Sequence, residues 1–327
     1  FSLTERQKSF WKKLYYNGLG EFFYLNTITC SEADFMTIET PSAQPFVRVD
    51  QPLQEKVIIP VGGGKDSVVT LELLRDDLPC TPLIVNPRGA TLGCVETAGF
   101  ADNEFMVVKR TLDPTMLEMN KQGFLNGHTP FSALLAFIGI LVGFGSGSRY
   151  IALSNESSAN ESTVPGTNIN HQYSKSIEFE RDFRNYVAQN INDKIEYFSF
   201  LRPLSELQIA YFFAQFKNYH PVFRSCNAGS KTDSWCGKCP KCLFTWIILS
   251  PFLSREKLVA IFGKDLMADE SLRPILEELN GTAAVKPFEC VGTVEEVNAC
   301  LKAADISTGS MTAAFAKVPE PVEGPSI

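Results

Sequence analysis

The residues best suited to chemistry lie in a glycine-rich segment, Gly62 to Ser67, which follows a β-branched run and precedes an apolar, helix-like run. A strand that stops at three glycines and continues as a helix exposes backbone N–H groups that can surround a phosphate. Lys65 adds a point charge, and Ser67 can contact phosphate or cap the helix. Asp66 is unusual beside phosphate unless it holds Mg²⁺ or a water. The segment predicts a phosphate site in which Asp66 is catalytic.

Spacing excludes the two commoner phosphate-binding loops. The Walker pattern requires glycine at Ile59 and serine or threonine at Asp66, and the dinucleotide-binding pattern requires glycine at Ser67. A plain glycine turn is the structural alternative, but it leaves the Lys-Asp-Ser run unexplained. The segment resembles the PP-loop of N-type ATP pyrophosphatases, Ser-Gly-Gly-x-Asp-Ser, with glycine in place of the first serine.

That family cleaves ATP between the α and β phosphates and adenylates a carboxylate, amide or carbonyl oxygen. The resemblance therefore implies ATP and Mg²⁺ as cofactors, with AMP and pyrophosphate as products. It implies these ATP ligands in the loop: Gly62, Gly63, Gly64, Lys65 and Ser67.

Composition and charge exclude several other classes of protein. The 327 residues are 44% hydrophobic and 20% charged, which is ordinary for a soluble globular protein. A net charge of −7 argues against a broad nucleic-acid surface. The apolar run 131–144 is shorter than the roughly twenty residues that span a bilayer, so we expect a buried helix and no membrane role. The chain begins with Phe1 and shows no signal-peptide core, so we expect its true beginning to be missing.

Strand-like and helix-like runs alternate through the middle of the chain. This alternation predicts an α/β fold, a doubly wound, mostly parallel sheet with helices on both faces. The expected strands are 57–61, 82–86, 105–109 and 150–154, and the expected helices are 65–75, 91–98 and 130–144. Ligands bind outside the carboxyl ends of such strands, so the loops that follow them should line the site.

Two of these loops are rich in polar side chains. Asn86 begins the loop that seats adenosine in a PP-loop enzyme. The run 154–162 is too rich in Asn, Ser and Glu for a strand or helix interior; it is either a solvated turn or a Mg²⁺ and substrate site. In the second case Glu156 and Glu161 are the metal carboxylates, and Asn155 and Asn160 contact substrate.

The segment 168–180 is a second polar stretch without apolar period, which predicts a binding loop that leads into a helix. His171 is a candidate acid/base, although a lone histidine is more often a structural hydrogen-bond partner. The other candidates, all for an anionic substrate, are Asn170, Tyr173, Lys175 and, further along the chain, Arg224.

Four of the nine cysteines have the spacing of metal ligands: Cys226, Cys236, Cys239 and Cys242. Two overlapping Cys-x₂-Cys turns and a fourth thiolate ten positions upstream can close a tetrahedron, which predicts a structural zinc site. An iron–sulfur cluster or a redox pair is the alternative. Cysteine use of this kind fits a reducing cytoplasm better than a disulfide framework.

The segment 288–296 is the last candidate. Thr293 and Glu296 form a capping box for a helix through residue 302, and this structural role is one complete explanation. The other is catalytic, because Glu289 and Cys290 lie just before a helix N-terminus, where the pKa of a thiol is lowered.

The chain is expected to divide into four parts. Residues 1–50, with an amphipathic helix at 4–16, form a lead-in that packs on the main domain. Residues 51–165 resemble a PP-loop (HUP-like) ATP-binding domain, and 166–304 form a helical region for substrate and zinc. Residues 305–327 are small and proline-rich, which predicts a disordered tail.

Six segments together resemble the UDP-N-acetyl-α-D-muramoyl-L-alanyl-L-glutamate epimerase (MurL) family over residues 15–303. These are the glycine loop, 21–26, 154–161, 170–180, the cysteine cluster and 288–296. The resemblance implies a cytoplasmic enzyme of peptidoglycan synthesis that epimerises the terminal glutamate of UDP-MurNAc-L-Ala-L-Glu through an acyl adenylate. Members of this family are longer at the N-terminus.

Other readings of the glycine loop remain open. 7-Cyano-7-deazaguanine synthase also joins a PP-loop to a four-cysteine zinc site. A tRNA-thiolating enzyme is a further PP-loop alternative, but it needs a basic surface that the acidic composition does not suggest. A nucleotide-binding scaffold without activity is the alternative outside enzymes, and Gly62 in place of serine is compatible with it.

Overall fold

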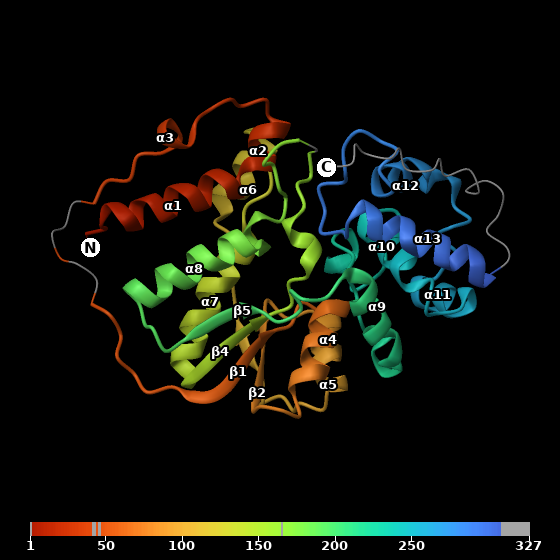
Figure 1. Cartoon of the computed structure of the whole chain (residues 1–327), viewed down its shortest axis with the longest axis horizontal. Coiled ribbons are helices and arrows are strands. Elements are labelled where there is room, and N and C mark those ends of the chain that lie inside the picture. Colours follow the sequence, from red (N-terminus) through yellow and green to blue (C-terminus); the bar gives the residue numbers. More distant parts are fainter. Residues whose placement is uncertain (1, 41–43, 45–46, 165, 309–327) are drawn as a thin grey trace, which may run out of the picture.

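A five-stranded parallel sheet organises the chain (Figure 1). The computed structural model describes residues 2–40, 44, 47–164 and 166–308. The strands are β1 Gln54–Pro60, β2 Cys80–Val85, β3 Met106–Val108, β4 Ser148–Leu153 and β5 Glu196–Ser199. Their order is β3-β2-β1-β4-β5, and every neighbouring pair is parallel. The predicted α/β class is confirmed. The sheet also includes β5, which the sequence did not reveal, so it extends beyond the boundary expected at residue 165.

Alternate residues of each strand face two separate cores. In β1, Val57 and Ile59 point into one core and Ile58 into the other, and all three are buried. The first core is covered by α4 (Lys65–Leu74) and α5 (Gly89–Thr97). The second is covered by α7 (Phe131–Ser146) and α8 (Ile177–Asn190). Burial on both faces explains why the central strands are continuous apolar runs.

The apolar helix α7 is present as predicted, but only one of its faces is buried: the small residues of that face pack on the sheet, whereas Leu134 and Leu141 are 41% and 72% exposed. It packs on β4 so closely that a Cβ added at Gly139 would lie 2.9 Å from Cγ2 of Ile151. Among the described residues, we find no helix whose length and apolar character would let it cross a membrane.

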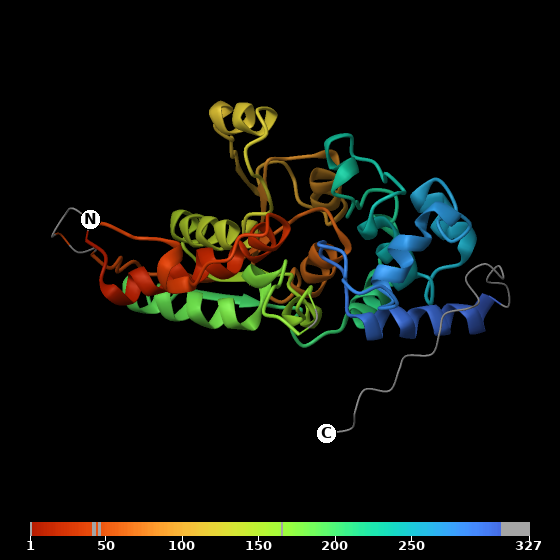
Figure 2. The ribbon, with the colours of Figure 1, turned by 90° about the horizontal axis from the view of Figure 1, so that it is seen from above.

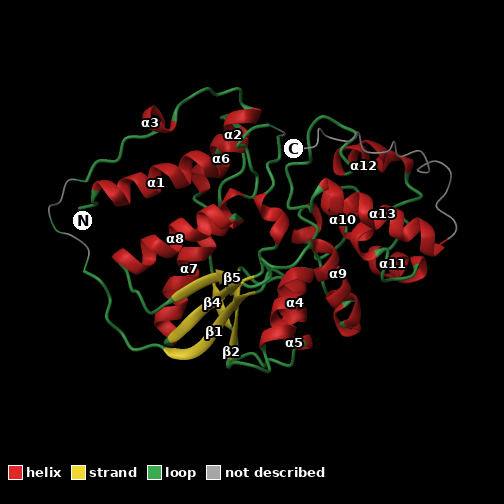
Figure 3. Cartoon of the chain, viewed as in Figure 1, coloured by secondary structure: helices red, strands yellow, loops and turns green. Residues whose placement is uncertain are grey.

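The C-terminal third forms a helical layer beside α4 that shares its core with one face of the sheet (Figures 1 and 3). Its helices are α9 Glu206–Gln215, α10 Pro240–Leu249, α11 Arg255–Phe262, α12 Arg273–Leu279 and α13 Val294–Thr308. The capping box of α13 is present as predicted: the backbone N–H of Glu296 donates to Thr293 Oγ1 at 3.1 Å, and that of Thr293 to Glu296 Oε2 at 2.8 Å. The helix reaches Thr308, four residues into the expected tail; residues 309–327 lie outside the described part.

The N-terminal lead-in packs against the second core, as expected. Helix α1 (Glu5–Gly18) begins at a capping box on Thr4, and Lys13 pairs with Glu178 at 2.6 Å and Asp182 at 2.8 Å on α8. It is followed by the short helices α2 (Gly20–Leu25) and α3 (Glu32–Phe35). A further helix, α6 (Pro114–Lys121), projects from the body in Figure 2.

Candidate active site at the carboxyl ends of the strands

The glycine loop connects β1 to α4 at the edge where the strands end. Gly63 has φ +81°, and a Cβ there would lie 3.0 Å from the backbone of Ala90 and Thr91. A Cβ at Gly64 would lie 2.8 Å from Ser225 Oγ. By contrast, no described atom lies within 4 Å of a Cβ built at Gly62, so a serine fits at this position. The departure from the PP-loop pattern at Gly62 is therefore not imposed by packing.

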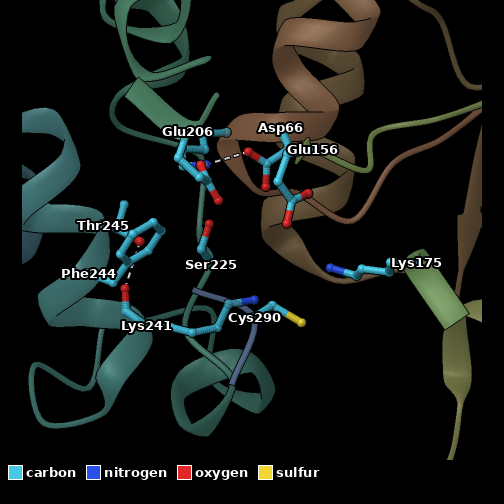
Figure 4. A pocket seen from close by; sticks show the side chains of 10 residues that line it. Asp66, Glu156, Lys175, Glu206, Ser225, Lys241, Phe244, Thr245 and Cys290 are labelled. Carbon is cyan, nitrogen blue, oxygen red and sulfur yellow. Dashed lines mark hydrogen bonds and ion pairs between the residues drawn. The ribbon is translucent and has the colours of Figure 1, made fainter. Parts of the chain in front are cut away.

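One pocket opens beside this loop, at the switch point where β1 and β4 lead to opposite sides of the sheet. It encloses about 320 Å³, counting space open to solvent. Figure 4 shows three carboxylates grouped at one end, with Ser225 between them and a second group of lysines and a thiol. The lining residues are Lys65, Asp66, Glu156, Lys175, Glu206, Ser225, Lys241, Phe244, Thr245 and Cys290.

Lys65 is buried at the carboxylate end. Its side chain is 3% exposed and forms ion pairs with Asp66 and with Glu206, which is equally buried. Burial opposes the charge of Lys65, but the two carboxylates raise its pKa above the usual value. Burial raises the pKa of Glu206, with the charges of Asp66 and Glu156 adding to it and Lys65 opposing. Lys65 therefore neutralises two carboxylates at this end of the pocket.

The loops that carry Glu156 and Lys175 are joined by one arginine. Arg202 donates to the backbone carbonyl of Glu156 at 2.9 Å, to the carbonyl of Lys175 and to Ser199 Oγ at 3.0 Å. Burial opposes the charge of Lys175, but the nearby Cys290, Glu156 and Asp66 raise its pKa. Lys175 is thus a fixed cation at the pocket wall.

Cys290 faces the cations at the other end. Burial alone would raise the pKa of its thiol, but the charges of Lys175 and Lys241 and a hydrogen bond with His171 lower it to about 6. Cys290 is therefore a thiolate at neutral pH. Glu289, the neighbouring candidate, accepts a hydrogen bond from Asn227 and does not line the pocket.

The pocket brings together five of the predicted site residues: Lys65 and Asp66 of the glycine loop, and Glu156, Lys175 and Cys290 from elsewhere in the chain. His171 lies beside Cys290. Several others form hydrogen bonds with neighbouring loops instead. Asn155 donates to Ser199 Oγ at 2.9 Å, and Asn160 accepts from the backbone N–H of Ile177 at 2.8 Å. Asn170 donates to the carbonyl of Ala159 at 2.9 Å.

The remaining candidates also have structural partners. Asn86 is exposed and exchanges hydrogen bonds of 2.7 and 2.8 Å with the backbone of Arg110. Glu161 pairs with Lys286, and Ser67 Oγ donates to the carbonyl of Gly64 at 3.0 Å. Tyr173 is buried in the second core. Arg224 donates to the carbonyls of Phe223 at 2.6 Å and Pro221 at 2.9 Å, while its own N–H donates to Gly63.

Sequence reasoning missed five pocket residues: Glu206, Ser225, Lys241, Phe244 and Thr245. Lys241 lies inside the second Cys-x₂-Cys turn, so its position next to a rigid cluster was a usable signal. Glu206 follows the N-cap Ser205, where an acidic residue is ordinarily explained by the helix dipole. Glu21, which bonds Nδ1 of His171, was part of a recognised segment but received no role.

The four predicted metal ligands converge beside the pocket. Their Sγ atoms are 3.8 Å apart for Cys226 and Cys239, 3.7 Å for Cys236 and Cys242, and 3.5 Å for Cys239 and Cys242. In a tetrahedral site with Zn–S bonds of about 2.3 Å, the sulfurs lie about 3.8 Å apart. The N–H of Gly229 also donates to Cys226 Sγ at 3.1 Å, which favours a thiolate. These residues fit a four-thiolate metal site.

The fold and site define a class: an α/β protein with a glycine-rich loop and a charged pocket at the carboxyl ends of a parallel sheet, extended by helices and a four-cysteine cluster. A family model described as the MurL N-terminal domain matches residues 1–200. A second, the MurL C-terminal domain, matches residues 222–318. The chain belongs to the MurL family.

Three curated relatives are named UDP-N-acetyl-alpha-D-muramoyl-L-alanyl-L-glutamate epimerase. The proteins from a Micromonospora species and from Salinispora tropica are each 39% identical to this chain and cover 86% of it. The protein from Xanthomonas oryzae pv. oryzae is 34% identical and covers 90%. The matched part is 64%, 63% and 66% of these relatives, respectively, so the chain spans about two-thirds of their length.

We expect Gly63→Ala to lower the free energy of unfolding by about 2–3 kcal/mol for two reasons. Alanine is strained in the left-handed conformation of this residue, and its Cβ would lie too close to the backbone of Ala90. The matched variant Gly62→Ser should change it by less than about 0.5 kcal/mol, because the added atoms meet open space. Urea titration of both variants measures the difference. Equal losses at the two positions would contradict this geometry of the loop.

Proposed function

We propose that this protein epimerises the terminal L-glutamate of UDP-MurNAc-L-Ala-L-Glu to D-glutamate with ATP as co-substrate, as a cytoplasmic step of peptidoglycan synthesis. The observation that carries the proposal is the pocket itself. It brings Asp66 of a loop suited to phosphate together with a thiolate, Cys290, and a fixed cation, Lys175. The names of the relatives supply the substrate class.

ATP has a chemical purpose in such a reaction. An ionised carboxylate disfavours removal of the neighbouring α-proton, because the resulting carbanion places charge beside charge. Attack of a carboxylate oxygen on the α-phosphorus forms a C–O–P linkage and expels pyrophosphate, which removes that charge. The C–H electron pair can then delocalise onto the carbonyl oxygen. After protonation on the opposite face, water cleaves the acyl–phosphate bond and releases AMP and the D-glutamyl product.

The two ends of the pocket suit the two halves of this reaction. Mg²⁺, when bound with ATP, supplies charge that the phosphates need, and the carboxylates of Asp66 and Glu156 are the groups placed to hold it. Lys175 and Lys241 offer positive charge to the substrate carboxylates. Cys290 is the proton-transfer group between these lysines.

The four-cysteine cluster supports the same pocket. Three of its ligands flank Lys241, at the start of α10, which also carries Phe244 and Thr245. A zinc ion held by these thiolates would therefore fix the pocket wall as well as the fold.

We accordingly expect one zinc ion per chain at this cluster. Cys239→Ser should lose it and unfold at a markedly lower temperature, because a closed four-thiolate site contributes on the order of 10 kcal/mol of binding energy to folding. Cys300→Ser, at a buried cysteine outside the cluster, is the control and should retain zinc. Elemental analysis and thermal unfolding measure both effects. Zinc-free wild-type protein, or full metal content in Cys239→Ser, would contradict the proposal.

The epimerase proposal predicts solvent exchange that depends on ATP. With ATP, Mg²⁺ and UDP-MurNAc-L-Ala-L-Glu in D₂O, the product should be D-glutamyl, carry deuterium at the α-carbon and appear with AMP in equal amount. Asp66→Asn should abolish both nucleotide cleavage and exchange. NMR of the α-position and mass spectrometry of the nucleotides give the readouts. If ATP is consumed while the glutamate stays L and undeuterated, the proposal is wrong and a nitrile-forming or thiolating reaction takes its place.

A further inference from the structure

Helix α2 of the N-terminal lead-in lies against two segments that are distant in sequence. Phe22 packs on Gly127, where an added Cβ would lie 3.0 Å from the ring, in the loop before α7. The ring of Tyr24 lies 5.7 Å from that of Phe288, two residues before Cys290. This short helix therefore connects the loop that carries His128 with the segment that carries Cys290.

The same helix supplies a carboxylate to a histidine. Glu21 bonds Nδ1 of His171, and the two side chains are 11% and 10% exposed. The backbone N–H of His171 donates to Thr163 Oγ1 at 3.0 Å, so both the ring and its main chain are held. The imidazole also lies beside Cys290, since each of these two side chains shifts the pKa of the other. Glu21, His171 and Cys290 thus form a continuous chain of contacts that ends at the pocket.

The charges around Cys290 come from several elements. Lys175 on the turn before α8 and Lys241 on α10 are cations, and Glu289 is the adjacent carboxylate. Burial opposes protonation of His171, but its bonds to Cys290 and Glu21 raise its pKa to about 9. The ring of His128 lies 4.2 Å from that of His171; burial and the His171 charge lower its pKa to about 4. His171 is the protonated histidine of the pair, and His128 is neutral.

We propose that Glu21, His171 and Cys290 form a proton-transfer relay in which Glu21 is a positioning residue supplied by the N-terminal lead-in. This inference rests on the proposed epimerase function. Glu21 orients His171 and keeps it protonated, and His171 holds Cys290 as a thiolate. Cys290 Sγ takes the α-proton of the activated glutamate, while the C–H electron pair moves into the enolate. Solvent water protonates the opposite face, and the Cys290 proton returns to solvent after product leaves.

A structural pair between Glu21 and His171 would hold α2 in place without changing the chemistry of Cys290. The relay, by contrast, makes the thiolate depend on Glu21, because loss of the carboxylate lets His171 release its proton at lower pH. Neutral His171 then no longer stabilises the thiolate. The pH dependence of Cys290 alkylation separates these two roles, and it does not require the enzyme to turn over.

The experiment is alkylation of the native chain with iodoacetamide across pH 4.5 to 9, with the Cys290 peptide quantified by mass spectrometry. The wild type should react with a midpoint near pH 6, and Glu21→Gln should shift the midpoint upward by roughly one pH unit. Glu32→Gln, which removes the same charge from an exposed position in the lead-in, should leave it unchanged. In turnover, Glu21→Gln should lower kcat roughly tenfold with little change in KM.

An unchanged midpoint in Glu21→Gln would overturn the relay. The relay would also be overturned if added Mn²⁺ protected Cys290 from alkylation in the wild type but not in Glu21→Gln. One ligand atom each of Glu21, His128 and His171 lies within 4.8 Å of the others, and such protection would assign the cluster to a metal ion. Failure of the epimerase proposal is distinguishable, since it would appear as absent deuterium exchange in a wild type whose alkylation midpoint is near pH 6.

Discussion

The buried ion pairs of Lys65 are the interaction on which the site depends. Lys65 and Glu206 are each 3% exposed, and burying two charges costs several kcal/mol per ion unless their pairing is close. The pair connects the first turn of α4 to the first turn of α9 across 141 positions of sequence. The backbone N–H of Glu206 in turn donates to Glu296 Oε1 at 2.7 Å, and Glu296 also caps α13. The N-termini of α4, α9 and α13 are therefore linked beside the glycine loop by the charged side chains of Lys65, Glu206 and Glu296.

This arrangement also separates the pocket into regions of opposite charge. Lys65 compensates part of the negative charge of Asp66 and Glu206 and leaves Asp66, which is one-third exposed, at the pocket surface. Lys175 and Lys241 are left to act on Cys290 and on an anionic ligand. The proposed reaction would need such opposite environments within reach of each other, one for a nucleotide with its metal ion and one for a carboxylate substrate. The pocket offers both because loops after β1, β4 and β5 end at the same edge of the sheet.

Local sequence patterns predicted the helices and strands around the site, because these elements depend on interactions between residues that are close in the sequence. The buried strands of the sheet, the glycine loop, the apolar helix α7 and the capping box at Thr293 all lie where the sequence indicated. The strand β5 was missed because its sequence, Glu-Tyr-Phe-Ser, begins and ends with polar residues and lacks the β-branched run that marks the other strands. The polar loop residues that were predicted to bind substrate have protein partners in the structure. Asn155, Asn160 and Asn170 satisfy nearby polar groups, which is the commonest role of asparagine in irregular segments. Glu21 and Glu206 could not be assigned, since their partners lie 150 and 141 positions away.

The central claim, that the Lys65–Glu206 pair joins the glycine loop to the helical layer, is tested most directly by a double-mutant cycle. Lys65→Met, Glu206→Leu and the double variant would be compared by the free energy of unfolding in denaturant. Lys65→Met leaves the buried Glu206 without its cation and should cost about 3–5 kcal/mol, whereas Glu206→Leu leaves Lys65 with Asp66 as its remaining partner and should cost less. The double variant should cost no more than Lys65→Met alone. Losses that simply add in the double variant would show that the two side chains act independently, and would contradict the account.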